Sequence, residues 1–435
     1  MSSEWKEISL DDIAELNGGY AFKSEEYTDK GHFVLRTVNI TDDGRICRDG
    51  AAYVSPAAAK KYERFLLKDL DTLFVMVGAT LGKTGLVKSG DLPALLNQNM
   101  WVVRARTDQV DPLFLHYAFK VISRPMCSLA SGSARGFVKR DDFRQMKIRA
   151  PEIRAQQRIS GLLGAIDDRI TLLRETNTTL EAIAQAMFKS WFVDFDPVRA
   201  KMAGRAPEGM DEATAALFPD ALEETELGVV PKGWQLMPIA DAFEFNPSRP
   251  LKKGMLAPYL DMASVATSGH RTDAPVMREL GSGTKFRNGD TLLARITPCL
   301  ENGKAAFVDF LDDLQIGWGS TEFLVMRPKG SLPDYFAYLL CKHQPFLDFA
   351  IQSMVGTSGR QRIQNEALGR YLLAVPPDAI ALAFGQVVAT AQSSIAANDE
   401  QAKTLASMRD TLLPRLISGQ LRLPEVQAQL ESHLS

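Results

Sequence analysis

The feature of this sequence that most constrains the fold is an uninterrupted stretch of 40 residues, Gln156–Phe195. Stepped alternately by four and three residues, it gives an apolar side chain at nine of ten positions, with Asn177 as the exception. The ten positions are Ile159, Leu163, Ile166, Ile170, Leu173, Asn177, Leu180, Ala184, Met187 and Trp191. Such a narrow seam is typical of a two-stranded coiled coil. The stretch therefore predicts a long helix that needs a partner.

A second seam begins 225 residues downstream at Phe384, and eight of its ten positions are apolar. If the two helices pack antiparallel with Ile159 opposite Leu416, Asn177 meets Asn398. A buried Asn pair is tolerated only when the two amides satisfy one another, and such a pair fixes the register. The residues that we assign to helix pairing are Ile159, Ile166, Leu173, Asn177, Leu180, Ile395, Asn398, Leu405 and Leu412.

An alternative is that each helix buries its stripe against its own globular domain. Arg409 and Pro414 favour this alternative, because a charge in the seam and an interior proline should perturb the last turns of the second helix. We favour the mutual pair, since an arbitrary pairing of two seams should not match the two asparagines.

The chain also repeats itself. Trp5 opens one half and Trp234 the other, and residues 71–87 (DTLFVMVGATLGKTGLV) have a counterpart at residues 290–308 (DTLLARITPCLENGKAAFV). Each half then runs into its long helix. Short apolar runs alternate with Gly- and Asp-bearing turns, which indicates mainly antiparallel sheet with small helices, for example at Pro112–Ser123 and Pro333–His343. Internal repeats of this kind determine the architecture.

These observations predict an α+β chain with a pseudo-two-fold internal repeat, in which two globular domains are separated by a long antiparallel two-helix coiled coil. The predicted segments are residues 1–151 (first domain), 152–195 (central helix), 196–232 (connector), 233–376 (second domain), 377–418 (distal helix) and 419–435 (tail). The connector looks irregular, with one short helix at Met210–Leu217, and Gly419 suits a helix C-cap.

Composition excludes several classes of protein. No stretch of 18 apolar residues and no leader-like start occurs, so we expect neither a membrane span nor a signal peptide. The four cysteines are far apart and form no C-x-x-C pair, which predicts reduced thiols, a cytoplasmic location and no metal site. The net charge of −3 is the sum of −6 in residues 194–230 and +3 in the rest of the chain, so the overall charge neither favours nor excludes DNA binding.

A phosphate-binding loop is also excluded. Residues 78–84 (GATLGKT) have three residues between their glycines where a P-loop needs four, and a strand-like segment follows. The counterpart in the other half keeps Gly303 and Lys304. Lys83 and Lys304 therefore either face a common ligand in both halves or are solvated turn residues. The chain has no recognisable catalytic constellation.

Four segments carry a family resemblance. They are WKEISLDDIAELNGGYAFKSEEY (5–27), AIDDRITLLRETNTTLEAIAQAMFKSWFVDFDPV (165–198), GMDEATAALFPDALEETELGVVPKGW (209–234) and TLLPRLISGQLRLPE (411–425). In these segments the chain resembles the specificity (S) subunit of a type I DNA restriction–modification system, and the resemblance covers essentially its whole length.

The resemblance implies two target-recognition domains that each read one half of a bipartite, asymmetric sequence in double-stranded DNA. It implies helices that set the spacer and dock two modification (methyltransferase) subunits, with restriction subunits completing an ATP-dependent translocase and endonuclease. No cofactor is expected on this chain, whereas S-adenosylmethionine, ATP and Mg are implied for the partner subunits.

Base and phosphate contacts favour Arg, Lys, Asn, Gln, Ser and Thr on loops. Clusters of this character predict the following DNA-binding residues: Lys23, Arg36, Asn39, Lys83, Asn97, Gln98, Ser133, Arg135, Lys139, Arg295, Lys304, Ser320, Thr321, Arg360 and Arg362. For each single residue, a turn or surface role remains the alternative.

The aromatic cluster at the end of the central helix exceeds what one seam can bury. It comprises Phe188, Trp191, Phe192 and Phe195. Either it packs on the second domain, or it docks a modification subunit, since exposed aromatic residues mark interfaces. Two rival functions stay open from the sequence. One is a self-sufficient DNA methyltransferase, which the missing motifs disfavour; the other is a non-catalytic coiled-coil adaptor whose two domains bind ligands other than DNA.

Overall fold

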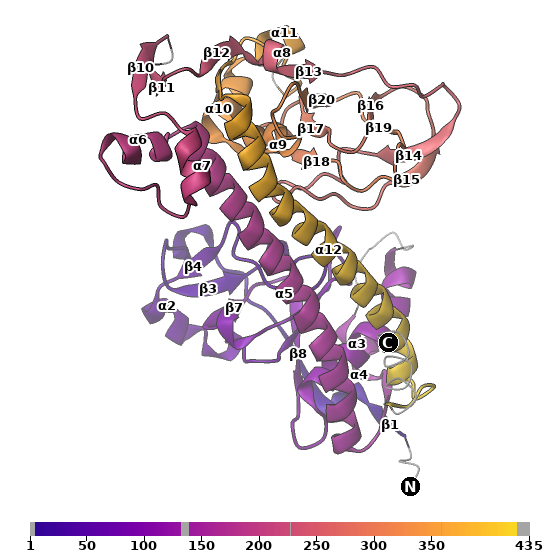
Figure 1. Ribbon diagram of the computed structural model, residues 1–435. Helices are drawn as coiled ribbons and strands as arrows, with labels where there is room; N and C mark the ends of the chain where they lie inside the picture. Colours follow the sequence, from indigo (N-terminus) through magenta and orange to yellow (C-terminus); the bar gives the residue numbers. More distant parts are fainter. Residues whose placement is uncertain (1–4, 132–138, 227, 358, 424–435) are drawn as a thin grey trace. The chain divides into compact units, whose positions relative to one another are not determined.

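The computed structural model describes residues 5–131, 139–226, 228–357 and 359–423. The chain divides into two compact units. Unit 1 contains Met1–Thr171 and Ala402–Ser435, and unit 2 contains Leu172–Gln401. Two helices of 40 residues each, α5 (Ile153–Phe192) and α12 (Asp378–Ile417), pass without a break from one unit into the other and lie side by side (Figure 1).

Unit 1 is built on two sheets. The first is antiparallel in the order β2-β8-β5-β6, and the second has the order β4-β3-β7, in which β3 and β7 are parallel. A pair of strands, β1 and β9, closes the unit next to α5. The strands are β1 (Lys6–Ser9), β2 (Ala14–Gly18), β3 (His32–Leu35), β4 (Ala52–Val54), β5 (Thr72–Val75), β6 (Thr84–Leu86), β7 (Ala94–Leu96), β8 (Met100–Ala105) and β9 (Lys147–Ala150). The helices are α1 (Leu10–Ile13), α2 (Pro56–Lys61), α3 (Pro112–Ser131) and α4 (Arg140–Arg144).

Unit 2 repeats this topology. Its antiparallel sheet has the order β13-β20-β17-β18, its mixed sheet has the order β15-β14-β19-β16 with β14 and β19 parallel, and β12 pairs with β21. The strands are β12 (Gln235–Pro238), β13 (Phe243–Phe245), β14 (Leu256–Leu260), β15 (Val276–Glu279), β16 (Thr284–Phe286), β17 (Thr291–Ala294), β18 (Ala305–Phe307), β19 (Gly317–Gly319), β20 (Phe323–Pro328) and β21 (Leu372–Val375). The helices are α8 (Ile239–Ala242), α9 (Tyr335–Lys342), α10 (Gln344–Gln352) and α11 (Asn365–Leu368).

The central strand of each antiparallel sheet is buried on both faces. In β5, Phe74 joins the cluster that contains Phe114 and Phe143, whereas Leu73 and Val75 join a second cluster on the opposite face. In unit 2, Leu293 and Leu292 of β17 are divided in the same way between two clusters. Alternate side chains of a strand point to opposite faces, so each sheet packs against α3 or α9 on one side and against the mixed sheet on the other. The α+β fold class and the internal repeat are confirmed.

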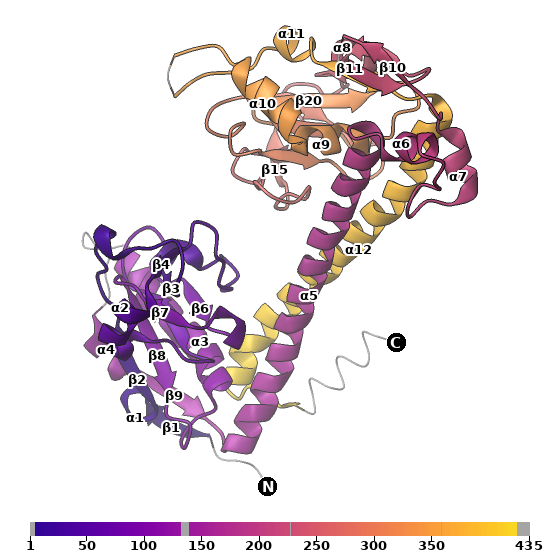
Figure 2. The same cartoon turned by 90° about the vertical axis from the view of Figure 1, so that its left-hand side faces the viewer.

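The connector is more regular than the sequence indicates. Besides α7 (Glu212–Leu217), which overlaps the expected short helix, it contains α6 (Asp196–Met202) and a hairpin of β10 (Leu222–Thr225) and β11 (Gly228–Pro231). The expectation of an irregular connector was wrong, because its apolar residues have partners: the ring of Phe218 packs edge-on against Trp191 of α5 at 5.1 Å, and Val198 is fully buried. Figure 2 shows α6 and α7 beside the end of α5.

Helix lengths also differ from expectation. Helix α3 extends through Pro125 to Ser131, eight residues beyond the predicted end. Helix α12 continues through Pro414 to Ile417, and Gly419 follows it with a positive φ of 76°, as expected of a C-cap glycine. Because Pro414 lies in the last turn, the turn that it could disturb is already close to the helix end.

Candidate nucleic-acid interface and helix pair

The part of the seam in unit 2 is centred on the two predicted asparagines. The Asn398 Nδ2 donates to Asn177 Oδ1 at 2.9 Å, and the Asn177 Nδ2 donates to the backbone oxygen of Ile395 at 3.2 Å. Leu173, Ile395 and Trp191 are buried, and Leu180 is partly buried. Each amide therefore has a partner in the register expected from the sequence, and the coiled-coil interpretation is confirmed.

The part of the seam in unit 1 accommodates Arg409 through an ion pair. The Arg409 Nη1 lies 2.6 Å from Asp167 Oδ1 of α5, and the Tyr117 hydroxyl donates to Asp167 Oδ2 at 2.6 Å. Ile159, Ile166 and Leu412 are buried around this group, and Leu405 is partly buried. Burial lowers the pKa of the nearby Lys120, and the charge of Arg409 lowers it further. The charge that argued against a mutual pair is thus satisfied by the partner helix.

The four aromatic side chains proposed for subunit docking are not exposed. Phe188, Trp191, Phe192 and Phe195 are 1%, 5%, 4% and 7% exposed. Within unit 2, Phe192 packs edge-on against Phe336 of α9 and Phe384 of α12, with ring centroids at 5.1 and 4.7 Å. The docking prediction for these residues is corrected: they form the core that joins the helix pair to the second domain, which was the alternative reading.

Other apolar side chains on the helices are exposed instead. Leu172 and Ile183 of α5 are 52% and 50% exposed, and Leu382 and Val387 of α12 are 56% and 43% exposed. A groove of about 510 Å³ follows the helix pair in unit 2, lined by Leu180, Gln386, Val387, Thr390, Ala391 and Ser394. Small residues such as Ala391 and Ser394 allow another helix to approach closely. We shall call this surface the helix groove.

Several predicted DNA-binding residues of unit 1 are used inside the domain. Asn39 is fully buried; its Oδ1 accepts from Arg36 N at 3.1 Å and its Nδ2 donates to Asp49 O at 3.2 Å. The guanidinium of Arg36 donates to the backbone oxygen of Gly50. Lys83 Nζ donates to Ile40 O at 2.9 Å and pairs with Asp42. Asn39 is thereby corrected from a DNA contact to a buried loop residue.

The equivalent residues of unit 2 behave alike. Lys304 Nζ donates to Met262 O at 2.8 Å, and Arg295 donates to Ile363 O at 2.7 Å. Arg362 forms a bidentate pair with Glu322, with the Nη2–Oε1 distance at 2.7 Å. Each of the two lysines donates to a backbone carbonyl of its own domain, so neither is simply a solvated turn residue, and contact with a common ligand stays a prediction.

The remaining candidates that the structure describes are partly or fully exposed. Asn97 and Ser320 are partly exposed, and the Ser320 hydroxyl accepts from Glu322 N at 3.1 Å. Ser133 and Arg135 lie outside the described residues. The candidates that stay exposed are Lys23, Gln98, Lys139, Thr321 and Arg360.

Two stacked arginines were missed by the sequence reasoning. The guanidinium of Arg278 lies 4.8 Å from the Tyr259 ring centroid and 6.0 Å from that of Trp318 in unit 2. In unit 1, Arg64 lies 4.5 Å from the Phe65 ring. Adjacent Arg and Phe at positions 64 and 65 are a weak local signal. The contacts of Arg278 are distant in sequence, so no local pattern could have found them.

The described residues contain no group of three or more His, Cys, Asp or Glu side chains placed to hold a metal ion. Residues 78–84 form the turn between β5 and β6 and not the start of a helix. Among the described helices, α12 is the one long and apolar enough to cross a membrane by length and composition. Some of its apolar residues, such as Val388, Ile395 and Leu412, are buried in the seam or in the unit cores, whereas Leu382 and Val387 are exposed.

Comparison with known proteins agrees with this architecture. Residues 2–182 match the family model described as "Type I restriction modification DNA specificity domain". The chain is 23% identical to the type I restriction enzyme HindI specificity subunit of Haemophilus influenzae, over 96% of this chain and 100% of that protein. It is 22% identical to the MjaIX specificity subunit of Methanocaldococcus jannaschii, over 82% of this chain and 78% of that protein. The structure of a type I restriction–modification S subunit from M. genitalium covers 96% of both chains with a TM-score of 0.53 at 15% identity, which is a likeness of fold.

Two topologically repeated domains on one shared helix pair define the class of fold that the chain shares with that S subunit. Within that class, the chain is similar to the specificity subunits of type I restriction–modification systems, in line with the resemblance found in the sequence. The family of specificity subunits has no catalytic activity of its own and implies no cofactor on this chain. It acts in DNA recognition as part of a complex with other subunits.

Proposed function

We propose that residues 1–151 and 233–376 are two target-recognition domains, each of which reads one half of a bipartite, asymmetric sequence in double-stranded DNA. The observation that carries this proposal is the repeated topology: both domains present the same sheets and the same joint to a helix pair. A recognition domain that occurs twice on a common helix pair suits a DNA target made of two half-sites. Residues 152–195 and 377–418 supply that element, 196–232 connect the halves, and 419–435 form the tail.

The helices set the spacer between the half-sites. A helix of 40 residues is about 60 Å long at about 1.5 Å per residue. One turn of DNA is about 34–36 Å, so this length corresponds to between one and two turns. An asparagine pair in the seam and the absence of a break in α5 and α12 support a fixed length.

The helix groove docks modification subunits. Its exposed Val387, its partly buried Leu180 and its small residues suit the apolar face of a partner helix. Two modification subunits, with S-adenosylmethionine, supply the methylation, and restriction subunits with ATP and Mg supply translocation and cleavage. The assembly works in the cytoplasm and needs no membrane.

The helix groove is tested by replacing one of its side chains. Val387→Asp should abolish co-purification of the modification subunits, because a carboxylate would be buried without a partner at the new interface. Thr178→Asp is the matched control, since Thr178 is exposed on α5 but does not line the groove. Retention of the modification subunits by Val387→Asp would contradict this placement.

The DNA proposal is tested in the assembled complex. The chain is co-expressed with its modification subunits in cells that lack other adenine methylation, and methylated adenines are mapped by long-read sequencing. The expected result is one bipartite motif with a fixed spacer. Absence of a motif, together with no shift of random duplex pools in a gel, would favour an adaptor whose domains bind other ligands.

Single exposed residues refine the test. Arg360→Ala should relax one position in one half-site only, because a bidentate arginine–guanine contact gives about 1–3 kcal/mol of discrimination. Gln98→Ala, in the other domain, should affect the other half-site only. Equal loss at both half-sites from either substitution would contradict the division of labour between the domains.

A further inference from the structure

A loop of unit 2 fastens the second domain to the helix pair. The loop joins β14 to β15 and carries His270 and Arg271 side by side. The ring of His270 is buried; its Nδ1 shares a hydrogen bond with the Tyr335 hydroxyl at 2.9 Å, and its Nε2 lies 3.3 Å from Asp309 Oδ2. The backbone of Phe307 also donates to His270 O at 3.0 Å. This part of the loop is thus anchored in its own domain.

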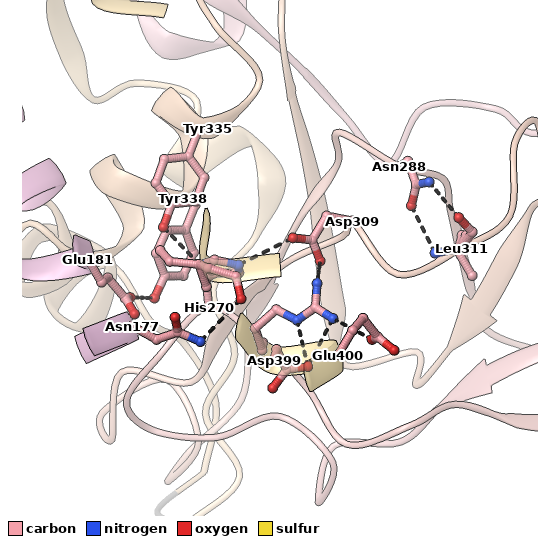
Figure 3. A network of polar contacts seen from close by, with 12 residues as sticks. Asn177, Glu181, His270, Asn288, Asp309, Leu311, Tyr335, Tyr338, Asp399 and Glu400 are labelled. Atoms are coloured by element: carbon pink, nitrogen blue, oxygen red, sulfur yellow. Dashed lines mark hydrogen bonds and ion pairs between the residues drawn. The ribbon is translucent and has the colours of Figure 1, made fainter. Parts of the chain in front are cut away.

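Arg271 extends from that anchor to α12. Its Nη1 donates to Asp309 at 2.6 Å, whereas its Nη2 donates to Asp399 at 3.0 Å and to Glu400 at 3.2 Å (Figure 3). The Arg271 side chain is 13% exposed, and the carboxylates of Asp309 and Asp399 are 17% and 23% exposed, so water screens these two pairs less than it screens the pair with the more exposed Glu400. One planar guanidinium therefore joins a carboxylate of the domain to two carboxylates of the helix, a geometry that a lysine cannot reproduce. Burial alone would raise the pKa of Asp309, but His270 and Arg271 hold it below its ordinary value, so the carboxylate stays charged.

A second route leads to α5. Tyr335 stacks on Tyr338 with ring centroids 5.2 Å apart, and the Tyr338 hydroxyl donates to Glu181 of α5. Glu181 lies one helical turn from Asn177, and Asp399 directly follows Asn398. The ties from the domain thus reach both helices at the place where the asparagine pair fixes their register.

The loop itself has little freedom. Lys304 Nζ donates to Met262 O at 2.8 Å, near the start of the loop. Lys342 Nζ donates to Thr267 O at 3.1 Å and to Gly303 O at 2.8 Å. Because these bonds hold the loop against β18 and α9, Arg271 cannot follow α12 without moving the domain.

We propose that Arg271 is a positioning residue for the second target-recognition domain. With Asp309, Asp399 and Glu400 it forms a clasp that holds this domain at one angle on the helix pair, and so restricts the complex to one spacer length. The inference rests on the proposed DNA function. It adds that spacer fidelity depends on this ionic clasp as well as on the length of the helices.

The expected effect follows from DNA geometry. Neighbouring base pairs differ by about 3.4 Å and about 35° along the duplex, so a domain free to rock by that amount can meet a half-site shifted by one step. Arg271→Gln would remove the cation that joins the carboxylate of the domain to the two carboxylates of α12, so the joint between domain and helix should loosen. The rate at shifted sites relative to the preferred site should therefore rise about tenfold.

The experiment uses the full complex of the chain with its modification subunits. Methylation rates are measured on duplexes that carry both half-sites with the preferred spacer or with spacers one base pair shorter and longer. Arg271→Gln should raise the relative rate on shifted spacers while the half-site sequences stay unchanged. Asp399→Asn combined with Glu400→Gln should do the same from the helix side. Adding Arg271→Gln to the double variant should change the relative rate on shifted spacers little further, because both sets of substitutions break the same ionic contact.

Lys189→Gln is the matched control. Lys189 of α5 pairs with Asp194, just after the end of α5, and this ion pair does not link the domain to α12, so its loss should leave the spacer preference as in the wild type. Arg271→Lys should restore the preference in part. Slower methylation by the same factor on every spacer would overturn the inference and assign Arg271 to general stability, and so would an unchanged spacer preference. If the wild-type complex has no bipartite motif, the proposed function itself fails, which is a distinct result.

Discussion

Lengthening both long helices by four residues should lengthen the DNA spacer. The insertion is placed between Thr171 and Leu172 in α5 and between Lys403 and Thr404 in α12, which are opposite one another in the register of Asn177 and Asn398. It leaves the polar ties of both units intact, because Asp167 and Arg409 lie on one side of it and the asparagine pair on the other. The seam continues through the added turn in both helices.

The magnitude follows from helix geometry. Four residues add about 6 Å and turn the helix by about 400°, which is about 40° beyond a full turn. Two base pairs of DNA add about 7 Å and turn by about 70°. The translation therefore matches two base pairs, and the remaining difference of about 30° must be absorbed by DNA twist. We expect the same half-sites with a spacer longer by one or two base pairs, and a lower affinity.

The assay is long-read mapping of methylated adenines in cells that express the variant with its modification subunits. Four residues inserted after Gly209, in the loop before α7, form the control and should leave the spacer as it is. An insertion in α5 alone should abolish activity, since it shifts one seam against the other. If the double insertion yields a folded complex that methylates sites with the original spacer, the length of the helix pair does not set the spacer length.

Three further outcomes concern single side chains. Asn398→Leu should destabilise unit 2 by about 1–3 kcal/mol in urea unfolding, because the Asn177 Oδ1 loses its donor. Phe192→Ala should cost about 3–5 kcal/mol in the same measurement, as expected for a large buried ring. Burial lowers the pKa of His116, which bonds Thr72, to about 3. His116 therefore binds fewer protons in the folded than in the unfolded state below about pH 6.5, and its contribution should lower stability by about 2 kcal/mol by pH 5, a part of the pH slope that His116→Gln removes.

Each of these three predictions can be contradicted by a specific result. The double substitution of both asparagines by Leu should recover stability lost by the single one, and failure to do so would mean that the amides are not partners. An unaltered free energy of unfolding in Phe192→Ala, with loss of subunit binding, would return this ring to the docking surface. A pH slope retained in His116→Gln would place the titrating group elsewhere.

The helix pair was predictable because its signal is local and periodic. Ten seam positions in each helix, with the two asparagines in matching places, determined direction and register before any contact was known. Arg409, in contrast, counted against the helix pair in the sequence, because its ion-pair partner Asp167 is 242 residues away and no local pattern shows it. A seam charge is satisfied or unsatisfied only by tertiary packing, which periodicity does not encode.

The candidate sites were predicted less well. Residue type and loop position indicate that Lys83, Lys304 and Arg362 can contact phosphates or bases, but they do not reveal that carbonyl and carboxylate groups of the same domain already occupy these side chains. For Phe188 and Phe192, apolarity indicated burial without saying whether the second domain or another subunit provides it. The clasp of Arg271 lies beyond sequence reasoning, because it joins three segments with no local pattern in common.

The return of α12 to unit 1 has a consequence for folding during synthesis. Leu413, Leu416 and Ile417 are buried in the same cluster as Phe114 and Leu163, so the core of unit 1 is completed by residues near the end of α12. About 240 residues separate Thr171 from this segment. At about 5–20 residues per second, the ribosome needs roughly 10 to 50 s to supply them. During that interval the first domain exposes the apolar surface that α12 later covers, whereas unit 2 can complete its core as soon as the first half of α12 emerges.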